Sequence, residues 1–254
     1  KAVLPSPMNL QIQNSENSQW NGEDIIFADY YVSEILNNVK SIEITLSGTV
    51  PGSLFGEITG NGSLNLNVDY TNIASPIAVS STQNIGLICN TLTSGILDVT
   101  GVTFPTSYSV TSTGTETSAS TETSAGGIVG KMCKGSKLVI NNFPSTVSVT
   151  TTGADNAGGI VGYLQNATVE VKGNGNDNNN KTLKSTITKN NKNDSVGNAG
   201  GLIGKAEQPT FSLEDGVTLT VKTECTAEGE NSNAGGLFGY LLTTDNEFSF
   251  EGNM

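Results

Sequence analysis

The chain has 254 residues, a formal net charge of −12, 30 glycines and only 14% charged residues. It contains no histidine, and all of its positively charged residues are lysines. The absence of histidine excludes Ser-His-Asp and Cys-His catalytic groups and the usual zinc sites. The absence of arginine removes the bidentate clamps that proteins prefer for phosphates. Nucleic acid and anionic membrane surfaces would repel so acidic a chain, so neither is an expected partner.

The first fifty residues differ from the rest and contain the only tryptophan, Trp20. Between residues 29 and 38 the apolar residues follow the spacing of a short amphipathic helix, which continues to Val39. A solenoid needs a cover over the open end of its core. Residues 1–40 are therefore interpreted as an N-terminal cap region that contains a short helix.

From Ser41 onward, apolar and polar residues alternate, as is typical of strands with one buried and one solvated face. The segments that follow this pattern are 42–46, 64–68, 96–99, 138–140, 147–150, 169–172, 219–222 and 248–250. Glycine or asparagine follows most of them, which indicates turns. The pattern predicts an all-β fold.

One phrase recurs four times in the second half of the chain. Ser124-Ala-Gly-Gly-Ile-Val-Gly-Lys131 returns at 156–163, 198–205 and 233–240, and weaker copies stand at 52–56 and 84–89. Aligned on the first bulky residue, successive copies lie 33, 41, 32, 42 and 35 residues apart; that residue is Leu54, Leu87, Ile128, Ile160, Leu202 or Leu237. A supersecondary unit repeated with variable insertions is the signature of a solenoid.

A unit of this length holds one coil of three short strands, each hydrogen-bonded to its equivalent in the next coil. We therefore expect a parallel β-helix, or β-solenoid, of about six coils over residues 41–254, continuing beyond the end of the chain. The motif glycines are interpreted as structural, because glycine permits positive φ at corners and close packing of backbones. These glycines are Gly126, Gly127, Gly130, Gly158, Gly159, Gly162, Gly200, Gly201, Gly204, Gly235, Gly236 and Gly239.

Two long insertions precede copies of the motif. Residues 104–124 contain a low-complexity Thr, Ser and Glu tract, and residues 173–197 are rich in asparagine. In stacked coils they would emerge along one edge of the rod, where solenoids often bind, although solvated spacer is the commoner meaning of such composition. The candidate binding residues on these loops are Thr111, Thr113, Thr115, Asn176, Asn180 and Asn193.

Other chemistry finds less support in the residues. Parallel β-helices include enzymes that act on polysaccharides with carboxylates, but no two candidate acids occupy equivalent positions in adjacent repeats; the candidates are Asp69, Asp98, Glu170, Glu214 and Asp215. The Gly-Gly phrases lack the Gly-Lys-Ser/Thr of a phosphate loop, and there is no spaced acidic calcium loop. We expect no enzyme activity, no cofactor and no metal.

Cysteine usage and hydropathy add two expectations. The three cysteines, Cys89, Cys133 and Cys225, form no CxxC pair and cannot all be paired within one molecule. One bridge with a free thiol and three buried thiols are both open, but we expect no bond between Cys89 and Cys133.

No apolar run approaches the roughly 18 residues that cross a bilayer, so membrane insertion is not expected.

The repeats resemble the GLUG repeat, named for Gly-Leu-hydrophobic-Gly and found in large bacterial surface proteins. The segments 201–204 and 236–239 match it directly, whereas 127–130 and 159–162 carry Ile in place of Leu. The stretch from Phe55 to Val68 is similar to the one that introduces such repeats, and the resemblance covers about residues 25–254. It implies a right-handed parallel β-solenoid in a secreted or cell-wall-attached protein, often adhesive or spacing. The chain lacks an Asn-Cys-Tyr-like strand after the motif and any peptidase signature, so no protease activity is implied.

The predicted function is that of a non-enzymatic structural or adhesive segment of a bacterial surface protein. It would act as a stiff rod that presents loops to a host glycan or protein, with adjoining repeats of a longer chain as further partners. The alternative is a carbohydrate-binding or carbohydrate-active β-helix, similar to a polysaccharide lyase or hydrolase. An exposed aromatic or acidic row beside a groove would favour that alternative.

Overall fold

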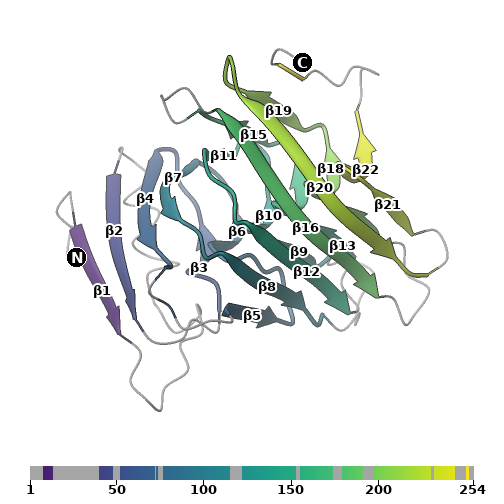
Figure 1. Ribbon diagram of the computed structural model, residues 1–254, viewed down its shortest axis with the longest axis horizontal. Helices are drawn as coiled ribbons and strands as arrows, with labels where there is room; N and C mark the ends of the chain where they lie inside the picture. The colour runs from purple at the N-terminus through teal and green to yellow at the C-terminus, as the bar shows by residue number, and fades with distance from the viewer. Residues whose placement is uncertain are drawn as a thin grey trace.

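The computed structural model describes residues 8–13, 40–47, 52–71, 73, 77–114, 122–152, 155–173, 179–190, 197–229, 232–243 and 250–251. These residues form four parallel sheets and contain no helix. In Figure 1 the strands stack in chain order from the purple N-terminal end to the yellow C-terminal end. The predicted all-β, parallel β-solenoid is therefore confirmed, whereas the predicted helix at 29–38 lies outside the described residues.

The largest sheet, sheet A, has eight strands. Its order is β1 (Met8–Gln13), β2 (Lys40–Ser47), β4 (Ser63–Asp69), β7 (Ile96–Thr103), β11 (Lys137–Ile140), β15 (Thr168–Val171), β19 (Thr210–Leu213) and β23 (Phe250–Glu251). Six of these strands coincide with or overlap predicted alternating segments. Strand β1 was not predicted; it pairs with β2 and extends sheet A into the segment interpreted as a cap.

Sheet B contains one strand from every copy of the motif, weak copies included. Its members are β3 (Phe55–Ile58), β6 (Cys89–Leu92), β10 (Val129–Met132), β14 (Val161–Gln165), β18 (Ile203–Glu207) and β22 (Phe238–Leu242). Cys89 pairs with Val129, so Ile88 rather than Leu87 is the equivalent of Ile128. The alignment on Leu87 was wrong by one residue. Leu87 and Ile88 are both bulky and apolar, so the sequence pattern alone does not show which of them is the equivalent of Ile128.

Two smaller sheets complete each turn. Sheet C contains β5 (Ile77–Ser81), β8 (Ser107–Ser112), β12 (Thr146–Thr152), β16 (Asn180–Asn190) and β20 (Thr218–Ala227). Sheet D contains β9 (Ser124–Gly126), β13 (Asn156–Gly158), β17 (Asn198–Gly200) and β21 (Asn233–Gly235). A complete turn visits sheets D, B, A and C in that order, so it holds four strands rather than the expected three.

Strand β16 is the main departure from the predicted elements, because it lies inside the asparagine-rich segment that was interpreted as one loop. Its inward positions alternate between apolar and polar residues: Lys181, Leu183, Ser185, Ile187 and Lys189 are buried. Two lysines and a serine on the inner face conceal the period-two pattern that marks the other strands. The insertion is thus divided between two corners of the solenoid.

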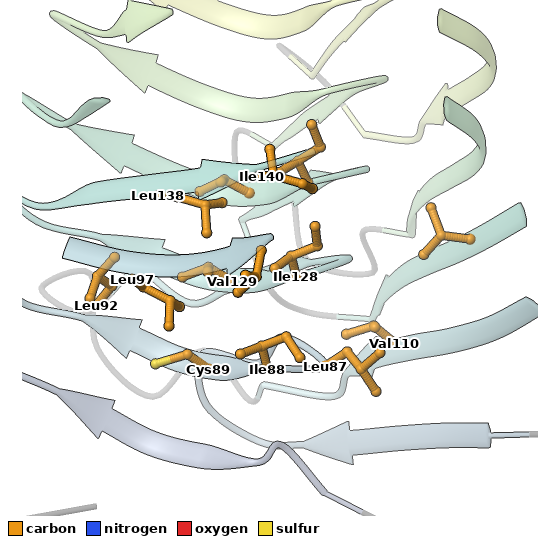
Figure 2. Close-up of a cluster of buried hydrophobic side chains, with 14 of the residues drawn as sticks. Leu87, Ile88, Cys89, Leu92, Leu97, Val110, Ile128, Val129, Leu138 and Ile140 are labelled. Carbon is orange, nitrogen blue, oxygen red and sulfur yellow. The ribbon is translucent and has the colours of Figure 1, made fainter. Parts of the chain in front are cut away.

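The core consists of rows of apolar side chains that stack from turn to turn. Figure 2 shows Leu87, Ile88 and Cys89 of one turn in a row beside Ile128 and Val129 of the next. All five are fully buried. Complete burial of such a side chain stabilises a fold by about 1.5–3 kcal/mol, so the rows are a main source of cohesion between turns.

The motif glycines lie where the backbones of adjacent turns approach most closely. A Cβ on Gly127, Gly159 or Gly201 would lie 2.1 Å from the carbonyl oxygen of the equivalent glycine in the next turn. A Cβ on the first glycine of each pair would lie 1.9 Å from a carbonyl oxygen three residues ahead, and one on the third glycine 2.5–2.7 Å from backbone of the preceding turn. Positive φ occurs elsewhere, at glycines between strands such as Gly95 and Gly135. The motif therefore needs glycine for space, and the expected role in positive-φ corners is wrong for these positions.

A ladder of side-chain amides runs through the first position of the motif. The Nδ2 of Asn156 donates to Ser124 Oγ (3.2 Å), that of Asn198 to Asn156 Oδ1 (2.8 Å), and that of Asn233 to Asn198 Oδ1 (2.9 Å). Asn156 and Asn198 are buried. Because an amide both donates and accepts, identical residues in register satisfy one another inside the structure.

The contact predicts that the second glycine of each pair tolerates a methyl group only in the last described turn. Gly159→Ala should lower the free energy of unfolding by about 1–3 kcal/mol, since its Cβ would overlap the backbone of Gly201. Gly236→Ala is the matched control, because a Cβ there meets nothing within 4 Å. Urea unfolding followed by circular dichroism measures both. Equal destabilisation of the two variants would contradict the role of the contact.

The amide ladder makes a second prediction. Asn156→Ala should destabilise the fold by about 1–3 kcal/mol, because the buried Nδ2 group of Asn198 loses its acceptor. Asn233→Ala removes the exposed terminal rung and should cost less, since the Asn198 oxygen left behind lies nearer to water. Thermal unfolding of the two variants provides the comparison, and a smaller shift for Asn156→Ala would refute the ladder as a stabilising element.

Candidate functional site

The last residue of the motif forms a row across sheet B in which lysine and tyrosine alternate. Lys131 pairs with Tyr163, Tyr163 with Lys205, and Lys205 with Tyr240. We call these four residues the Lys–Tyr row. Parallel in-register strands place equivalent residues side by side, so four lysines would repel one another. Alternation with tyrosine separates the cations and places each beside an aromatic ring.

Tyr163 occupies the centre of the Lys–Tyr row. The Nζ atoms of Lys131 and Lys205 lie 5.2 and 4.9 Å from its ring centroid, within the range of cation–π interactions. Its hydroxyl donates to Glu207 Oε2 at 2.8 Å. The side chain is only 5% exposed. It is therefore a packed part of the row and is not available as a stacking platform for a ligand.

Lys205 connects the row to a distant part of the chain. Its ammonium group lies 2.7 Å from Glu122 Oε1 and 3.0 Å from Glu207 Oε1. Glu122 belongs to the segment between β8 and β9, which joins sheet C to sheet D two turns earlier. Gln165 donates a further hydrogen bond to Glu207 at 3.3 Å. The ion pair thus fastens one inter-strand segment onto the outer face of sheet B.

The charges of this cluster are mutually stabilised. Burial favours the neutral form of Glu207, but the hydrogen bonds from Tyr163 and Lys205 outweigh it, so the pKa of this carboxyl is lowered. Burial likewise opposes the charge of Lys205, but Glu122 and Glu207 outweigh it and raise the pKa of the ammonium group. Burial and the neighbouring Glu207 raise the pKa of Tyr163. A glycosidase acid must be protonated at working pH, and Glu207 is ionised there. The cluster therefore holds Glu122 against the outer face of sheet B through charged groups.

The acids singled out from the sequence are not brought together. Asp69 and Asp98 each accept hydrogen bonds from the threonine two residues later, and Glu170 pairs with Lys137 at 2.8 Å. The register partners of Asp98 in sheet A are Asn65 and Val139, so no second described carboxylate stands next to it in the stack. Glu214 accepts from the backbone N–H of Gly173, and Asp215 lies exposed in a turn.

The candidate binding residues are distributed differently from the expectation. Thr111 lies in β8 and Asn180 is the first residue of β16, so both are strand rather than loop residues. Neither strand was among the predicted alternating segments, and β16 was placed inside a predicted loop. Thr113 follows β8 and is exposed. Thr115, Asn176 and Asn193 lie outside the described residues.

The connections from sheet C to sheet D nevertheless occur at the same point of the strand order in four successive turns. Segments 113–123, 153–155, 191–197 and 228–232 each join a strand of sheet C to the following strand of sheet D. We call this the C–D edge. Segment 172–179, which contains Asn176, joins sheet A to sheet C at a different corner.

The Lys–Tyr row and its partner Glu122 were not identified from sequence. The available signal was the Lys, Tyr, Lys, Tyr alternation at the end of the motif.

Metal and thiol chemistry find no assembled site in the described part of the chain. No group of three or more Cys, Asp or Glu side chains there could hold a metal ion. The three cysteines are free thiols, and burial raises the pKa of Cys89, which is fully enclosed. None of the described segments is a helix able to span a membrane.

Comparisons of the chain with family models, with curated proteins and with solved structures found no match.

The cluster around Lys205 makes the stability of the fold at low pH depend on the carboxyl group of Glu207. A lowered pKa means that the contribution of Glu207 is present above its ordinary value of 4.5 and is lost as the pH falls through the folded-state value. Glu207→Gln should therefore destabilise the protein by about 0.5–1 kcal/mol at pH 7, and by less at pH 3.

Urea unfolding at the two pH values measures this difference. Glu170→Gln, which removes the separate ion pair with Lys137, is the matched control and should have a smaller effect at pH 7. A difference between Glu207→Gln and the unmodified chain that is the same at both pH values would contradict the assignment.

Proposed function

We propose that this chain is a non-enzymatic segment of a bacterial cell-surface or secreted protein, which acts as a stiff rod and presents the C–D edge to a host glycan or protein. The observation that supports this most directly is the stacking of all six motif copies in one continuous parallel sheet. The GLUG-like character of those copies supports the extracellular setting. The variable segments of the C–D edge are its candidate recognition surface.

A spacing function follows from how the rod is held together. Adjacent strands of a sheet lie about 4.8 Å apart, so each turn adds that distance along the axis. From β9 onward, four sheets, the glycine contacts and the ladder that begins at Ser124 all connect one turn to the next. Bending the rod would strain several of these connections at once. Its length therefore depends on the number of turns, which suits a part that holds another surface at a distance.

Recognition at the C–D edge is supported by the variable length of its segments. The segments there range from the three residues of 153–155 to the eleven of 113–123, although the strands on both sides keep their register. Glu122 fastens the longest of them onto sheet B through Lys205. A surface that varies in length on an invariant frame is the usual location of binding residues.

A carbohydrate-binding or carbohydrate-active β-helix is the second candidate. Its supporting observation is the Lys–Tyr row, in which Tyr240 is 39% exposed beside Lys205. Aromatic rings and charged groups together can recognise sugars. Tyr163, however, is enclosed by its lysine neighbours, so the row offers one accessible ring rather than a continuous platform.

The decisive measurement is binding of the full chain to an array of glycans and host extracellular proteins. We expect hits that are lost when residues 115–121 or 191–196 are replaced by Gly/Ser segments of equal length. Replacement of 174–178, at the corner between sheets A and C, is the matched control and should preserve them. Hits that survive all three replacements, or sugar products released from a polysaccharide, would overturn the proposal.

A further inference from the structure

The inner face of sheet C carries a column of polar side chains at the end where its strands lead out toward sheet D. Ser81, Ser112, Thr151 and Lys189 stand in register there, on four successive strands. The last three are fully buried. Ser112 Oγ donates to Gln83 O of the preceding turn at 3.0 Å, whereas Thr151 Oγ1 has no hydrogen-bond partner among the described residues. The column therefore lies where a side chain can reach the backbone of the segments that leave sheet C.

Lys189 makes such a connection to the C–D edge of the next turn. Its backbone carbonyl accepts from the N–H of Glu228 at 2.9 Å, and its Nζ donates to the carbonyl oxygen of the same residue at 3.4 Å. The Nζ atom also donates to Ser232 Oγ at 3.4 Å, and that hydroxyl group donates to Glu228 O at 3.0 Å. Glu228 and Ser232 are the first and last residues of segment 228–232. One buried ammonium group thus joins both ends of the segment to sheet C.

Gly197 leaves the space that this side chain needs. A Cβ on Gly197 would lie 1.8 Å from Lys189 Cε and 2.3 Å from its Nζ. The carbonyl oxygen of Gly197 accepts from the N–H of Asn233 at 2.8 Å, so the residue after the segment is held as well. Lys189 and Gly197 together hold residues 228 and 232–233 against the preceding turn.

Packing alone does not explain a buried lysine at this position. Transfer of an ammonium group out of water is costly, and an apolar side chain fills a core with less loss of free energy. Two residues earlier on the same face of β16, Ile187 is equally buried and apolar. An ammonium group has three donors and no acceptor, so it can hold several carbonyl and hydroxyl oxygens at once. The contacts of Lys189 therefore indicate a role in holding segment 228–232.

We propose that Lys189 is a positioning residue of the C–D edge, which holds both ends of segment 228–232 in place and so determines how this segment meets a partner. The contacts of Lys189 support the first part of the proposal. The second part rests on the proposed function, in which the C–D edge is the recognition surface. A surface that is ordered before it binds loses less entropy on binding, so the restraint raises affinity.

Hydrogen exchange measured by NMR tests the positioning. Lys189→Met removes the ammonium group and keeps most of the length of the side chain. We expect the N–H of Asn233 to exchange about tenfold faster, because the hydrogen bonds of a charged donor no longer oppose local opening. The equivalent N–H of Asn198, which donates to Asp155 O one turn earlier, should keep its rate. Unchanged exchange at Asn233, or a rise of equal size at Asn198, overturns the proposal.

Two buried polar residues of sheet C serve as matched controls. Lys181→Met removes the other inward lysine of β16, which lies toward the opposite end of the strand. Thr151→Val removes the hydroxyl group that has no partner among the described residues. Both should leave exchange at Asn233 within about twofold of the unmodified chain. If either variant accelerates exchange as much as Lys189→Met does, a general weakening of sheet C explains the effect and the proposal fails.

Gly197→Ala provides a second route, which keeps Lys189 in the chain and tests the proposal should Lys189→Met fail to fold. The new methyl group would displace the ammonium group, so exchange at Asn233 should again rise. In a Lys189→Ala background the same change should add less than about twofold, because no long side chain remains to be displaced. Circular dichroism confirms that each variant is folded. Effects that multiply in the double variant would contradict the link between Gly197 and Lys189.

Binding is measured separately, on the array of glycans and host proteins. Glu228 is exposed, so a hit that Glu228→Ala weakens is one that contacts the segment. For such a hit, Lys189→Met should raise the Kd by about tenfold. An unchanged Kd would overturn the role of Lys189 in recognition. An array without hits would instead overturn the proposed function, and the exchange rates would still decide whether Lys189 positions the segment.

Discussion

The structure depends on one steric constraint: the backbones of adjacent turns touch at the motif glycines. At the second glycine of each pair, a side-chain carbon would lie 2.1 Å from the next turn, which no other residue could accept without separating the turns. Sheet D exists only where this contact is made. In the weak copy at 84–89, Leu87 stands in the place of the second glycine, and the strand is reduced to a single bridge between Ile85 and Ala125. The Ala-Gly-Gly phrase is therefore a requirement of close stacking, and its repetition carries no information about a ligand.

Close stacking in register also restricts what every other position can hold, because each residue stands beside its equivalents in the turns before and after. Apolar rows and amide rows satisfy this condition with identical residues, as Asn156 and Asn198 do. Rows of identical charges are less favourable, since like charges opposite one another repel, although sheet C places Lys184 beside Lys222. The alternation of Lys131, Tyr163 and Lys205 solves this problem on sheet B. The same restriction is consistent with the low content of charged residues, which is 14% in the whole chain.

Much of this architecture could be predicted, because comparison of the repeated copies shows where each unit begins and ends. The motif strands and most strands of sheet A follow directly from periodicity. The register, strand β16 and the Glu122–Lys205 pair could not be predicted, because they depend on contacts between turns that the sequence of a single turn does not show. Register placed Ile88, not Leu87, beside Ile128, since either residue satisfies the apolar pattern. Strand β16 was hidden because Lys181, Ser185 and Lys189 occupy inward positions. Glu122 and Lys205 are 83 residues apart, and only the stacking of the turns brings them together.

The same constraint determines where the chain is free to vary. From Ile128 to the first residue of β11 the chain takes nine residues, and from Ile160 and Leu202 to the equivalent strands it takes eight. This part of each turn follows the contact of the glycine pair, and in these three turns its length differs by one residue at most. The differences in spacing between copies must therefore be taken up at the corners on either side of sheet C. Residues there can change composition and length while the frame is unaffected, so specificity for a partner can diverge at the C–D edge without any loss of cohesion between the turns.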